Sequence, residues 1–465
     1  MSKLITLLEK LIGKKPTQQI NESKESTNNK KIEKLQKPES LSYLLKLSEH
    51  WNGYKREEAV KKLCALNKSE AIPKLILRAN DWVPEVRKAA LESITSFASK
   101  NHAEAFVLYL PDLYHLRNCA RNNHEDLINY IEQYLVTNTN SQFVIQGINN
   151  ENELIARACI TLCIDFELID PVSIVKVGLQ HNDIIVRAKS SYLLRKLTGI
   201  EQVNALKLAL KDSFMPIRRE AFQICLKTDE SVSFIEPYLY DRHSSIREIA
   251  LKKLQLQSVD IPSIYEKSLK SSLVSKLKCS IWGLGFLKCK DISHHIFEFL
   301  QSPYPSVRKQ SLSTLSNLYN EEFNLTLVKY LQDPSPAVCK EVTKLCDKQN
   351  IVFTASDLIK IMELAEYEHI ISNSLAISKH INKWERFIFL LRLLEHKALN
   401  SLIGVDKIRE YLFEWNEDFN KTYCQPSMKQ LKIMETLYLS TKPLLGTEQF
   451  NVVLFTLKTL GIHKD

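Results

Sequence analysis

Apolar residues recur every three to four positions along most of the chain, which is the period of an amphipathic helix. Apolar stretches such as residues 71–79, 172–180 and 325–332 are each followed by a short polar turn and a second stretch with the same period. Only 10 glycines and 15 prolines occur among the 465 residues, so few positions interrupt helices. The pattern therefore predicts an all-α chain built from helix pairs.

One arginine position recurs near the start of the second helix of many pairs. Its members are Arg56, Arg87, Arg157, Arg187, Arg218, Arg247 and Arg308. The spacing is 31 residues from Arg56 to Arg87, and Cys339 follows Arg308 by another 31. Lys278 lies midway in the 61-residue gap between Arg247 and Arg308 and takes the arginine position there. Such self-similarity predicts a solenoid, in which each pair buries its apolar face by stacking on its neighbours.

In several repeats an aspartate stands six residues before the arginine and an alanine three residues after it. The aspartates are Asp81, Asp212, Asp241 and Asp333, and the alanines are Ala59, Ala90, Ala221 and Ala250. A carboxylate at this place accepts hydrogen bonds from the free N–H groups of the following helix, and alanine lets neighbouring helices approach closely. Prolines precede four of these helices, where a missing N–H costs little.

This Asp-x5-Arg pattern closely resembles HEAT repeats, and the short period is most similar to the phycobilisome-lyase-type subfamily of HEAT-like repeats. The resemblance covers about residues 41–350 and implies a right-handed α-solenoid of about nine helical-hairpin repeats. It also implies a ladder of Asp and Arg side chains between stacked turns, and that the helix carrying the arginine lines the concave side. The residues that match the ladder are Asp81, Arg87, Asp212, Arg218, Asp241 and Arg247, whereas Lys278 and Cys339 depart from it.

The segments outside and within the array differ in composition. Residues 1–13 predict a short amphipathic helix, either a cap docked on the first repeat or a partner-binding peptide. Residues 14–40 are rich in Lys, Gln, Asn and Ser and predict a disordered linker. Residues 351–465 lack the arginine but keep helical periodicity, so they form a helical C-terminal cap or a separate domain. The 70 residues from Arg87 to Arg157 hold either degenerate repeats or an interruption.

Charge and cysteine usage narrow the class of protein. The net charge is +9, and residues 1–40 carry +4 of it, with nine Lys and five Glu. A protein dedicated to nucleic-acid binding usually has a more strongly basic surface. The 10 cysteines include no CxxC pair and the histidines no ligand spacing, so we expect no metal and free thiols in the reducing cytoplasm. No stretch of 18 apolar residues predicts a membrane span.

Two sets of side chains are candidates for partner binding. Basic residues directly follow the arginine position at Lys88, Arg219, Lys309 and Lys340. They form either a solvated face or a basic stripe for an acidic protein segment or a phosphate backbone. Trp51 and Trp82 each stand five residues before their arginine, so they occupy the same place in successive repeats. Such rings either join one turn to the next or form a hot spot for a protein partner.

The sequence contains no catalytic motif, such as a Gly-rich phosphate loop, a Gly-x-Ser-x-Gly elbow or a His-Glu-x-x-His zinc helix. The HEAT-like resemblance brings two enzymatic alternatives, bilin attachment and DNA glycosylase action, and the latter needs a Trp and a carboxylate that converge. Trp82, Trp282 and Asp81 are the candidates for that pair. The sequence therefore favours a non-catalytic scaffold, adaptor or inhibitor that needs no cofactor and binds a protein partner, and the basic stripe would suit an acidic one. Nucleic-acid binding or repair through a basic groove is the alternative.

Overall fold

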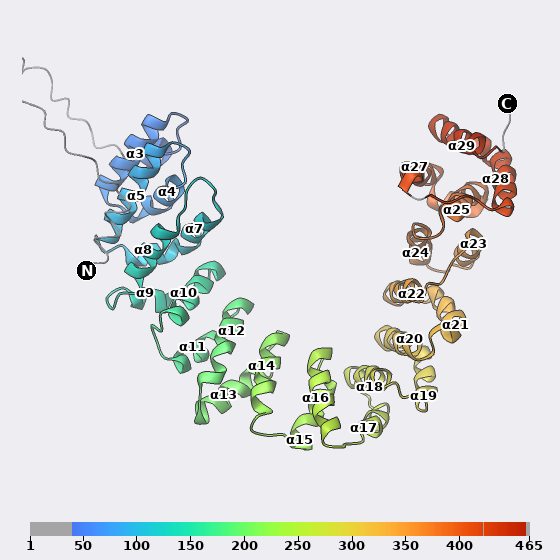
Figure 1. Cartoon of the computed structure of the whole chain (residues 1–465), viewed down its shortest axis with the longest axis horizontal. Helices are drawn as coiled ribbons and strands as arrows, with labels where there is room; N and C mark the ends of the chain where they lie inside the picture. Colours follow the sequence, from blue (N-terminus) through green and yellow to red (C-terminus); the bar gives the residue numbers. More distant parts are fainter. Residues whose placement is uncertain (1–39, 422, 462–465) are drawn as a thin grey trace, which may run out of the picture. The chain divides into compact units, whose positions relative to one another are not determined.

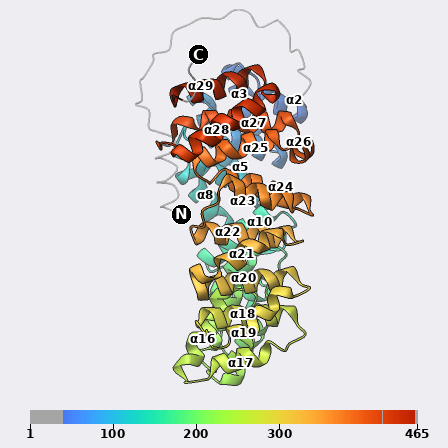
Figure 2. The ribbon, with the colours of Figure 1, turned by 90° about the vertical axis from the view of Figure 1, so that its right-hand side faces the viewer.

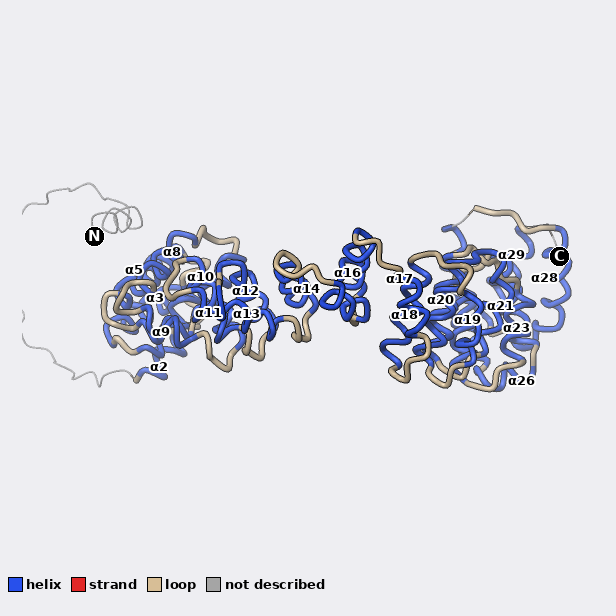
Figure 3. The backbone as a smooth tube through the Cα atoms, turned by 90° about the horizontal axis from the view of Figure 1, so that it is seen from below, coloured by secondary structure: helices blue, strands red, loops and turns tan. Residues whose placement is uncertain are grey.

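The computed structural model describes residues 40–421 and 423–461, and every regular element within them is a helix (Figure 3). The chain divides into two units, residues 1–229 and 230–465. The predicted all-α helical-repeat solenoid is confirmed. The helical segment predicted at residues 1–13, and the linker up to residue 39, lie outside the described residues.

Unit 1 consists of short helices in sequence order. They are α2 Leu41–Leu47, α3 Gly53–Leu66, η1 Ser69–Ala71, α4 Ile72–Arg78, α5 Pro84–Ala98, α6 Ala103–Leu108, α7 Leu110–His115, η2 Leu116–Asn118, α8 Glu125–Leu135, α9 Ser141–Gly147, α10 Glu153–Asp165, α11 Pro171–Gly178, α12 Ile184–Ser191, η3 Tyr192–Lys196, α13 Gly199–Ala209 and α14 Met215–Cys225. The hydrophobic core of this unit extends without a break from Leu44 to Ile224. Each helix pair thus shares its buried face with its neighbours, as a solenoid requires.

Unit 2 continues the same alternation. Its helices are α15 Val232–Ile235, η4 Glu236–Tyr240, α16 Ser244–Leu256, α17 Ile261–Ser268, α18 Val274–Phe286, α19 Ser293–Glu298, η5 Phe299–Gln301, α20 Pro305–Tyr319, η6 Asn320–Phe323, α21 Asn324–Lys329, η7 Tyr330–Gln332, α22 Pro336–Lys348, α23 Ala355–Glu363, α24 Glu368–Ser378, α25 Lys383–Glu395, α26 Lys397–Ile403, α27 Val405–Glu417, η8 Phe419–Lys421, α28 Met428–Thr441, η9 Lys442–Leu444 and α29 Thr447–Thr459. Figure 2 shows these helices stacked one above the next.

The helices of unit 2 form two layers. The second helices of the pairs, α16, α18, α20 and α22, lie in one layer, and the first helices α17, α19 and α21 lie in the other (Figure 1). Within the layer of second helices, α18 packs on α20 and α20 packs on α22. The alanines that follow the repeated arginine are fully buried, Ala90 and Ala250 among them, because only a small side chain fits where these helices touch.

The helix ends follow from local chemistry. Proline opens α5, α20 and α22, where its missing N–H is not needed. Asn52, Asp170 and Asp183 accept hydrogen bonds at the starts of α3, α11 and α12. Several first helices tighten into a 3-10 turn before the polar turn, as η4, η5 and η7 do.

The two irregular parts of the sequence are also helical. The segment from Arg87 to Arg157 holds α6, α7, α8 and α9, and these helices pack on one another and on α5 and α10. Beyond residue 350 the stacking continues directly, because α22 contacts α24 and α23 contacts α25. The C-terminal helices of the described residues thus extend the array without a spacer.

Candidate functional site

Arginine and aspartate side chains form a ladder that joins successive turns. Arg56 Nε lies 2.9 Å from Asp81 Oδ2, and Arg56 Nη2 lies 2.7 Å from Asp81 Oδ1. Equivalent two-point contacts join Arg157 to Asp183, Arg187 to Asp212 and Arg308 to Asp333. Each arginine therefore pairs with the aspartate of the following repeat, 25 or 26 residues later. Two parallel bonds of this kind fix the geometry of both partners.

The same arginines also hold their own turn. Nη1 donates to the backbone carbonyl six residues earlier, as Arg87 does to Asp81 O at 2.7 Å. Arg218 makes this contact with Asp212 O at 2.9 Å, and Arg247 with Asp241 O at 2.7 Å. The three Asp–Arg pairs named from the sequence thus meet through the backbone carbonyl of the aspartate. The carboxylates of Asp81 and Asp212 bind the arginine of the preceding repeat instead.

Two of the ladder carboxylates, those of Asp81 and Asp183, are stabilised in their charged form. Burial alone would raise the pKa of Asp81, but hydrogen bonds from Arg56 and from the Val83 N–H outweigh it and lower the pKa below the usual value. The hydrogen bonds from Arg157 lower the pKa of Asp183 to about 2, although burial opposes this shift. These aspartates therefore carry a full negative charge at neutral pH.

Trp51 and Trp82 flank a hollow of about 250 Å³ between the first two turns of the ladder. Their side chains are 80% and 66% exposed, respectively. Trp82 also makes a cation–π contact, since the Arg56 guanidinium lies 5.4 Å from its ring centroid. Trp82 contacts the preceding repeat, as expected of a ring that joins one turn to the next. Both rings also present most of their surface to solvent, as expected of a hot spot for a partner.

Three arginines make the hollow cationic. Arg56 and Arg78 both bind Asp81, so two positive charges face one carboxylate. Arg121 comes from the segment without an arginine repeat and donates to Asn80 O at 3.2 Å. Glu49 also lines the hollow, but Lys74 pairs with it. The hollow thus combines exposed indole rings with an excess of guanidinium charge. We refer to it as the Trp51–Trp82 hollow.

The basic residues that follow the arginine position lie on the second helices. Lys88 is exposed and lies 3.9 Å from Glu92. Lys309 is half-buried and pairs with Glu341 of the next repeat at 3.0 Å. Arg219 and Lys340 are exposed. Since Lys88 and Lys309 have carboxylate neighbours, the surface around them is of mixed charge.

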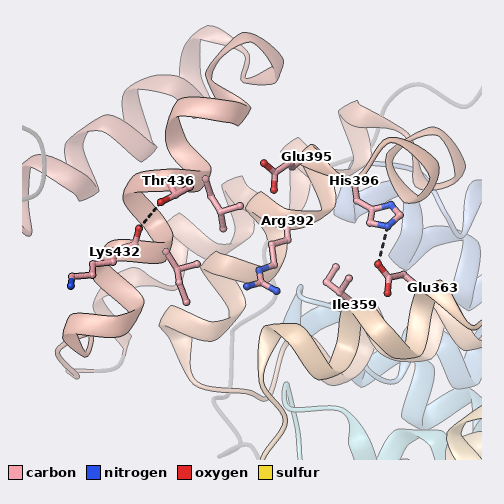
Figure 4. Close-up of a pocket in the computed structure, with 9 residues that line it drawn as sticks. Ile359, Glu363, Arg392, Glu395, His396, Lys432 and Thr436 are labelled. Carbon is pink, nitrogen blue, oxygen red and sulfur yellow. Dashed lines mark hydrogen bonds and ion pairs between the residues drawn. The ribbon is translucent and has the colours of Figure 1, made fainter.

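A second hollow lies among the C-terminal helices of unit 2 (Figure 4). It measures about 640 Å³, and its lining includes Ile359, Arg392 and Lys432 from α23, α25 and α28. The guanidinium of Arg392 bonds Ser356 Oγ at 2.9 Å, while His396 Nε2 and Glu363 Oε1 form a pair at 3.1 Å across the rim. This groove offers charges of both signs over an apolar floor.

Among the residues considered for glycosylase action, the carboxylate of Asp81 is bonded by arginine side chains and is not free beside Trp82. Both oxygens of Asp81 are bonded by Arg56, and Arg78 bonds one of them as well, so the carboxylate next to Trp82 is already occupied. Trp282 belongs to unit 2, where its ring stacks on Phe286 at 5.1 Å. Within residues 40–421 and 423–461, no group of three His, Cys, Asp or Glu side chains could hold a metal ion. All ten cysteines are free.

Sequence reasoning missed one ladder residue, Asp183, and described two further positions incompletely. Asp183 binds Arg157 but stands four residues before Arg187 rather than six, so it fell outside the expected spacing. Cys339 replaces arginine and still holds its own turn, because its thiol lies 3.2 Å from Asp333 O, six residues back. Arg308 stands four residues after Tyr304, the N-cap residue of α20. The residue four positions after Leu273, the N-cap residue of α18, is Leu277, so Leu277 and not Lys278 takes the arginine position there.

Comparisons with known proteins concern the fold. The sequence matches no protein-family model and no curated protein. Among solved structures, importin beta aligns over 90% of this chain and 66% of its own, with 10% identity and a TM-score of 0.34. Kap121p aligns over 90% of this chain and 45% of its own, with 13% identity and a TM-score of 0.26. This chain thus spans less than two thirds of the length of either protein.

A third similar structure is an array of tumor overexpressed gene domains from microtubule polymerases. It aligns over 82% of this chain and all of its own, with 12% identity and a TM-score of 0.22. These similarities are to HEAT-like and importin-like helical repeats and extend to no sequence family. Across the part of the chain that is described, no helix is long and apolar enough to cross a membrane.

Proposed function

We propose that this chain is a non-catalytic, cytoplasmic protein-binding scaffold, and that unit 1 binds a partner at the Trp51–Trp82 hollow. The observation that carries the proposal is the exposure of two tryptophans, 80% and 66%, at the same place in successive repeats beside a cationic hollow. Tryptophan and arginine are the residues most enriched among the energetically dominant contacts of protein interfaces. The Arg56–Trp82 contact leaves most of the surface of both indoles in water, where a partner can reach it.

The charge of the hollow indicates the kind of partner. Arg56, Arg78 and Arg121 line it, and Asp81 is its one buried carboxylate. An acidic protein segment with neighbouring apolar side chains would place carboxylates near the guanidinium groups and apolar groups on the rings. Charge-assisted hydrogen bonds of this type are stronger than those between neutral groups.

Affinity purification with matched variants tests this function. The tagged protein, a Trp51→Ala/Trp82→Ala variant and a Tyr192→Ala control would be purified at moderate salt, with and without nuclease. Tyr192 is 70% exposed and belongs to the same unit, so its loss controls for general surface changes. We expect a partner protein in stoichiometric amount that stays bound after nuclease treatment. The control should retain this partner, and the double variant should lose it. A partner retained equally by all three proteins would contradict the role of the hollow.

Nucleic-acid binding is the second candidate, and the same hollow supports it. Arg121 is exposed beside two rings, and single-stranded nucleic acids bind by base stacking on aromatic side chains next to basic groups. Such binding weakens steeply as salt rises. If the purified protein carries nucleic acid that nuclease or about 0.5 M salt removes, and no protein partner, the result would favour this candidate over the first.

A further inference from the structure

The hollow among the C-terminal helices of unit 2 is a groove along α25 (Figure 4). The helix α25 packs against both α23 and α28, and residues of these two helices form the sides of the groove. Its volume of about 640 Å³ lies within the range of roughly 300–1,000 Å³ that is typical of ligand sites in proteins. We refer to it as the Arg392 groove, after the arginine of α25 that lines it.

Polar contacts at both ends of α25 hold the sides of the groove in place. Near the start of α25, Glu385 accepts hydrogen bonds from the Ala355 N–H at 2.8 Å and from Gln430 Nε2 at 2.7 Å. This carboxylate therefore joins α25 to both α23 and α28. Just beyond the end of α25, His396 pairs with Glu363 of α23. The groove is thus built by specific contacts of the folded unit.

Arg392 lies in this groove without a carboxylate partner. Its side chain is half-buried and lies between Ile359 of α23 and Thr436 of α28 (Figure 4). Nη1 donates to Ser356 Oγ at 2.9 Å, whereas Nε and Nη2 bond no described residue. Neither of these two nitrogens is fully buried. The Nε and Nη2 edge of the guanidinium can therefore be reached from the groove.

The carboxylates around the groove do not neutralise this arginine, because none of those in the described residues lies within ion-pair distance of it. Glu385 is occupied by its two hydrogen bonds, and Glu363 by His396. Glu395 and Lys432 also line the groove, but both are exposed, and their opposite charges balance one another at the surface. Arg392 is therefore the half-buried charge of the groove that lacks an opposite charge.

Arg386 on the same helix provides an internal contrast. It is buried, and its Nη1 and Nη2 pair with Asp418 at 3.4 Å and with Glu414 at 3.5 Å. One arginine of α25 is thus neutralised within the chain, and the other is not. Partial burial of a guanidinium without an anion costs free energy, which a bound carboxylate would offset.

Apolar side chains border the groove on both sides of Arg392. Ile359 of α23 and Leu437 of α28 are buried, and Ile433 of α28 is half-buried. A ligand in the groove thus meets aliphatic side chains on either side and a charged donor between them. A protein segment that combines acidic and aliphatic side chains is complementary to this arrangement.

We propose that the Arg392 groove binds a short segment of a partner protein in which a Glu or Asp is flanked by aliphatic side chains. The carboxylate accepts hydrogen bonds from Nε and Nη2 of Arg392, an edge whose planar geometry fits two carboxylate oxygens. The flanking aliphatic side chains pack on Ile359 and Ile433. The site lies in unit 2 and does not depend on the Trp51–Trp82 hollow, so either site can fail its test without the other.

Peptide binding to the full chain tests the groove. A fluorescein-labelled twelve-residue peptide of alternating Glu and Leu would be titrated and followed by anisotropy, with a Gln-Leu peptide and a labelled single-stranded oligonucleotide as comparison probes. All proteins would carry Trp51→Ala/Trp82→Ala, so that the hollow of unit 1 contributes no signal. The variants are Arg392→Gln and, as a matched loss of charge, Lys429→Gln, because Lys429 is exposed on α28 and does not line the groove.

A second pair of variants adds charge without touching the core. Thr436 lines the groove and is exposed, so Thr436→Glu places a carboxylate there, and Thr436→Gln has the same size without the charge. Thermal melting followed by circular dichroism would check that each variant is folded. If Arg392→Gln melts markedly lower than the parent protein, the Thr436 pair decides.

The expected result is a roughly tenfold weaker Kd for the Glu-Leu peptide with Arg392→Gln. Thr436→Glu should also weaken binding, because its carboxylate repels that of the peptide. Lys429→Gln and Thr436→Gln should leave the Kd unchanged within about twofold. The Gln-Leu peptide should bind the parent protein more weakly than the Glu-Leu peptide.

The proposal is overturned if the parent protein binds neither peptide, or binds both equally well. Equal Kd values for Arg392→Gln and Lys429→Gln, or for the two Thr436 variants, would overturn it as well. An effect of Arg392→Gln on the oligonucleotide alone would assign the groove to phosphate and would also overturn it.

Discussion

Arg56 and Asp81, 25 residues apart in the sequence, form a buried two-point ion pair between the first two turns of the solenoid. Arg56 also bonds the carbonyls of His50 and Trp51, so one guanidinium joins its own turn to the next. The side chains are only 3% and 1% exposed, so water competes little for these bonds. The pair thereby fixes the spacing of the two tryptophans that flank the hollow.

Arg56→Gln should destabilise unit 1 by about 3 kcal/mol, because it leaves the buried carboxylate of Asp81 with a single arginine partner. Lys61→Gln, which breaks the exposed pair with Glu57, should change stability by less than about 0.5 kcal/mol. Urea denaturation and hydrogen exchange of the α3 and α5 amides would measure both. Equal effects of the two substitutions would contradict the structural role of the ladder.

Acid should weaken the rung of Asp183 within a defined pH range. Because the folded-state pKa is lowered from 3.8 to about 2, the ionised carboxylate stabilises the folded state fully above about pH 5, and this contribution is lost as the pH falls through the unfolded pKa toward 2. The shift corresponds to roughly 2 kcal/mol. Asp183→Asn should remove that part of the pH dependence, as measured by urea midpoints between pH 2 and 5. A variant with the same slope as the parent protein would show that other carboxylates dominate.

Gly283 has no room for a side chain. A Cβ at this position would lie 2.2 Å from Cε2 of the Tyr265 ring, which is itself fully buried. Gly283→Ala should therefore destabilise unit 2 by about 1–3 kcal/mol despite the better helix propensity of alanine. The thermal melting of Gly283→Ala, Tyr265→Leu and the double variant would test the contact. Strictly additive effects would mean that the ring and the new methyl group do not collide.

The buried thiols should be chemically inert in the folded protein. Burial raises the pKa of Cys159 to about 12 and that of Cys163 to about 12, so only about one in ten thousand of these groups is a thiolate at pH 8. Iodoacetamide followed by mass spectrometry should label the half-buried Cys119 well before either of them. In urea all three should react at similar rates. Rapid labelling of Cys159 without denaturant would contradict the packing of α10.

Periodicity was sufficient to predict the helix pairs and their stacking. The arginine about every 31 residues, the aspartate before it and the alanine after it are local signals, and several repeats carry all or part of this pattern. The ladder partners were harder to assign, because each arginine bonds the carboxylate of the following repeat, as Arg56 bonds Asp81, and not that of its own turn. Asp183 was missed since an aspartate four residues before the arginine reaches the same place as one six residues before it elsewhere.

The sequence by itself determined the class of fold, because helical periodicity, proline positions and small residues act within a few turns of the chain. Only the tertiary structure decided which charges are satisfied, since that depends on what the neighbouring turn supplies. Arg56 and Arg247 occupy the same place in the repeat, and one meets Asp81 while the other meets a turn with Ser271. The stacking of repeats sets both the burial of each arginine and the partner that it meets, so the position in the repeat alone does not tell whether an arginine has a carboxylate partner.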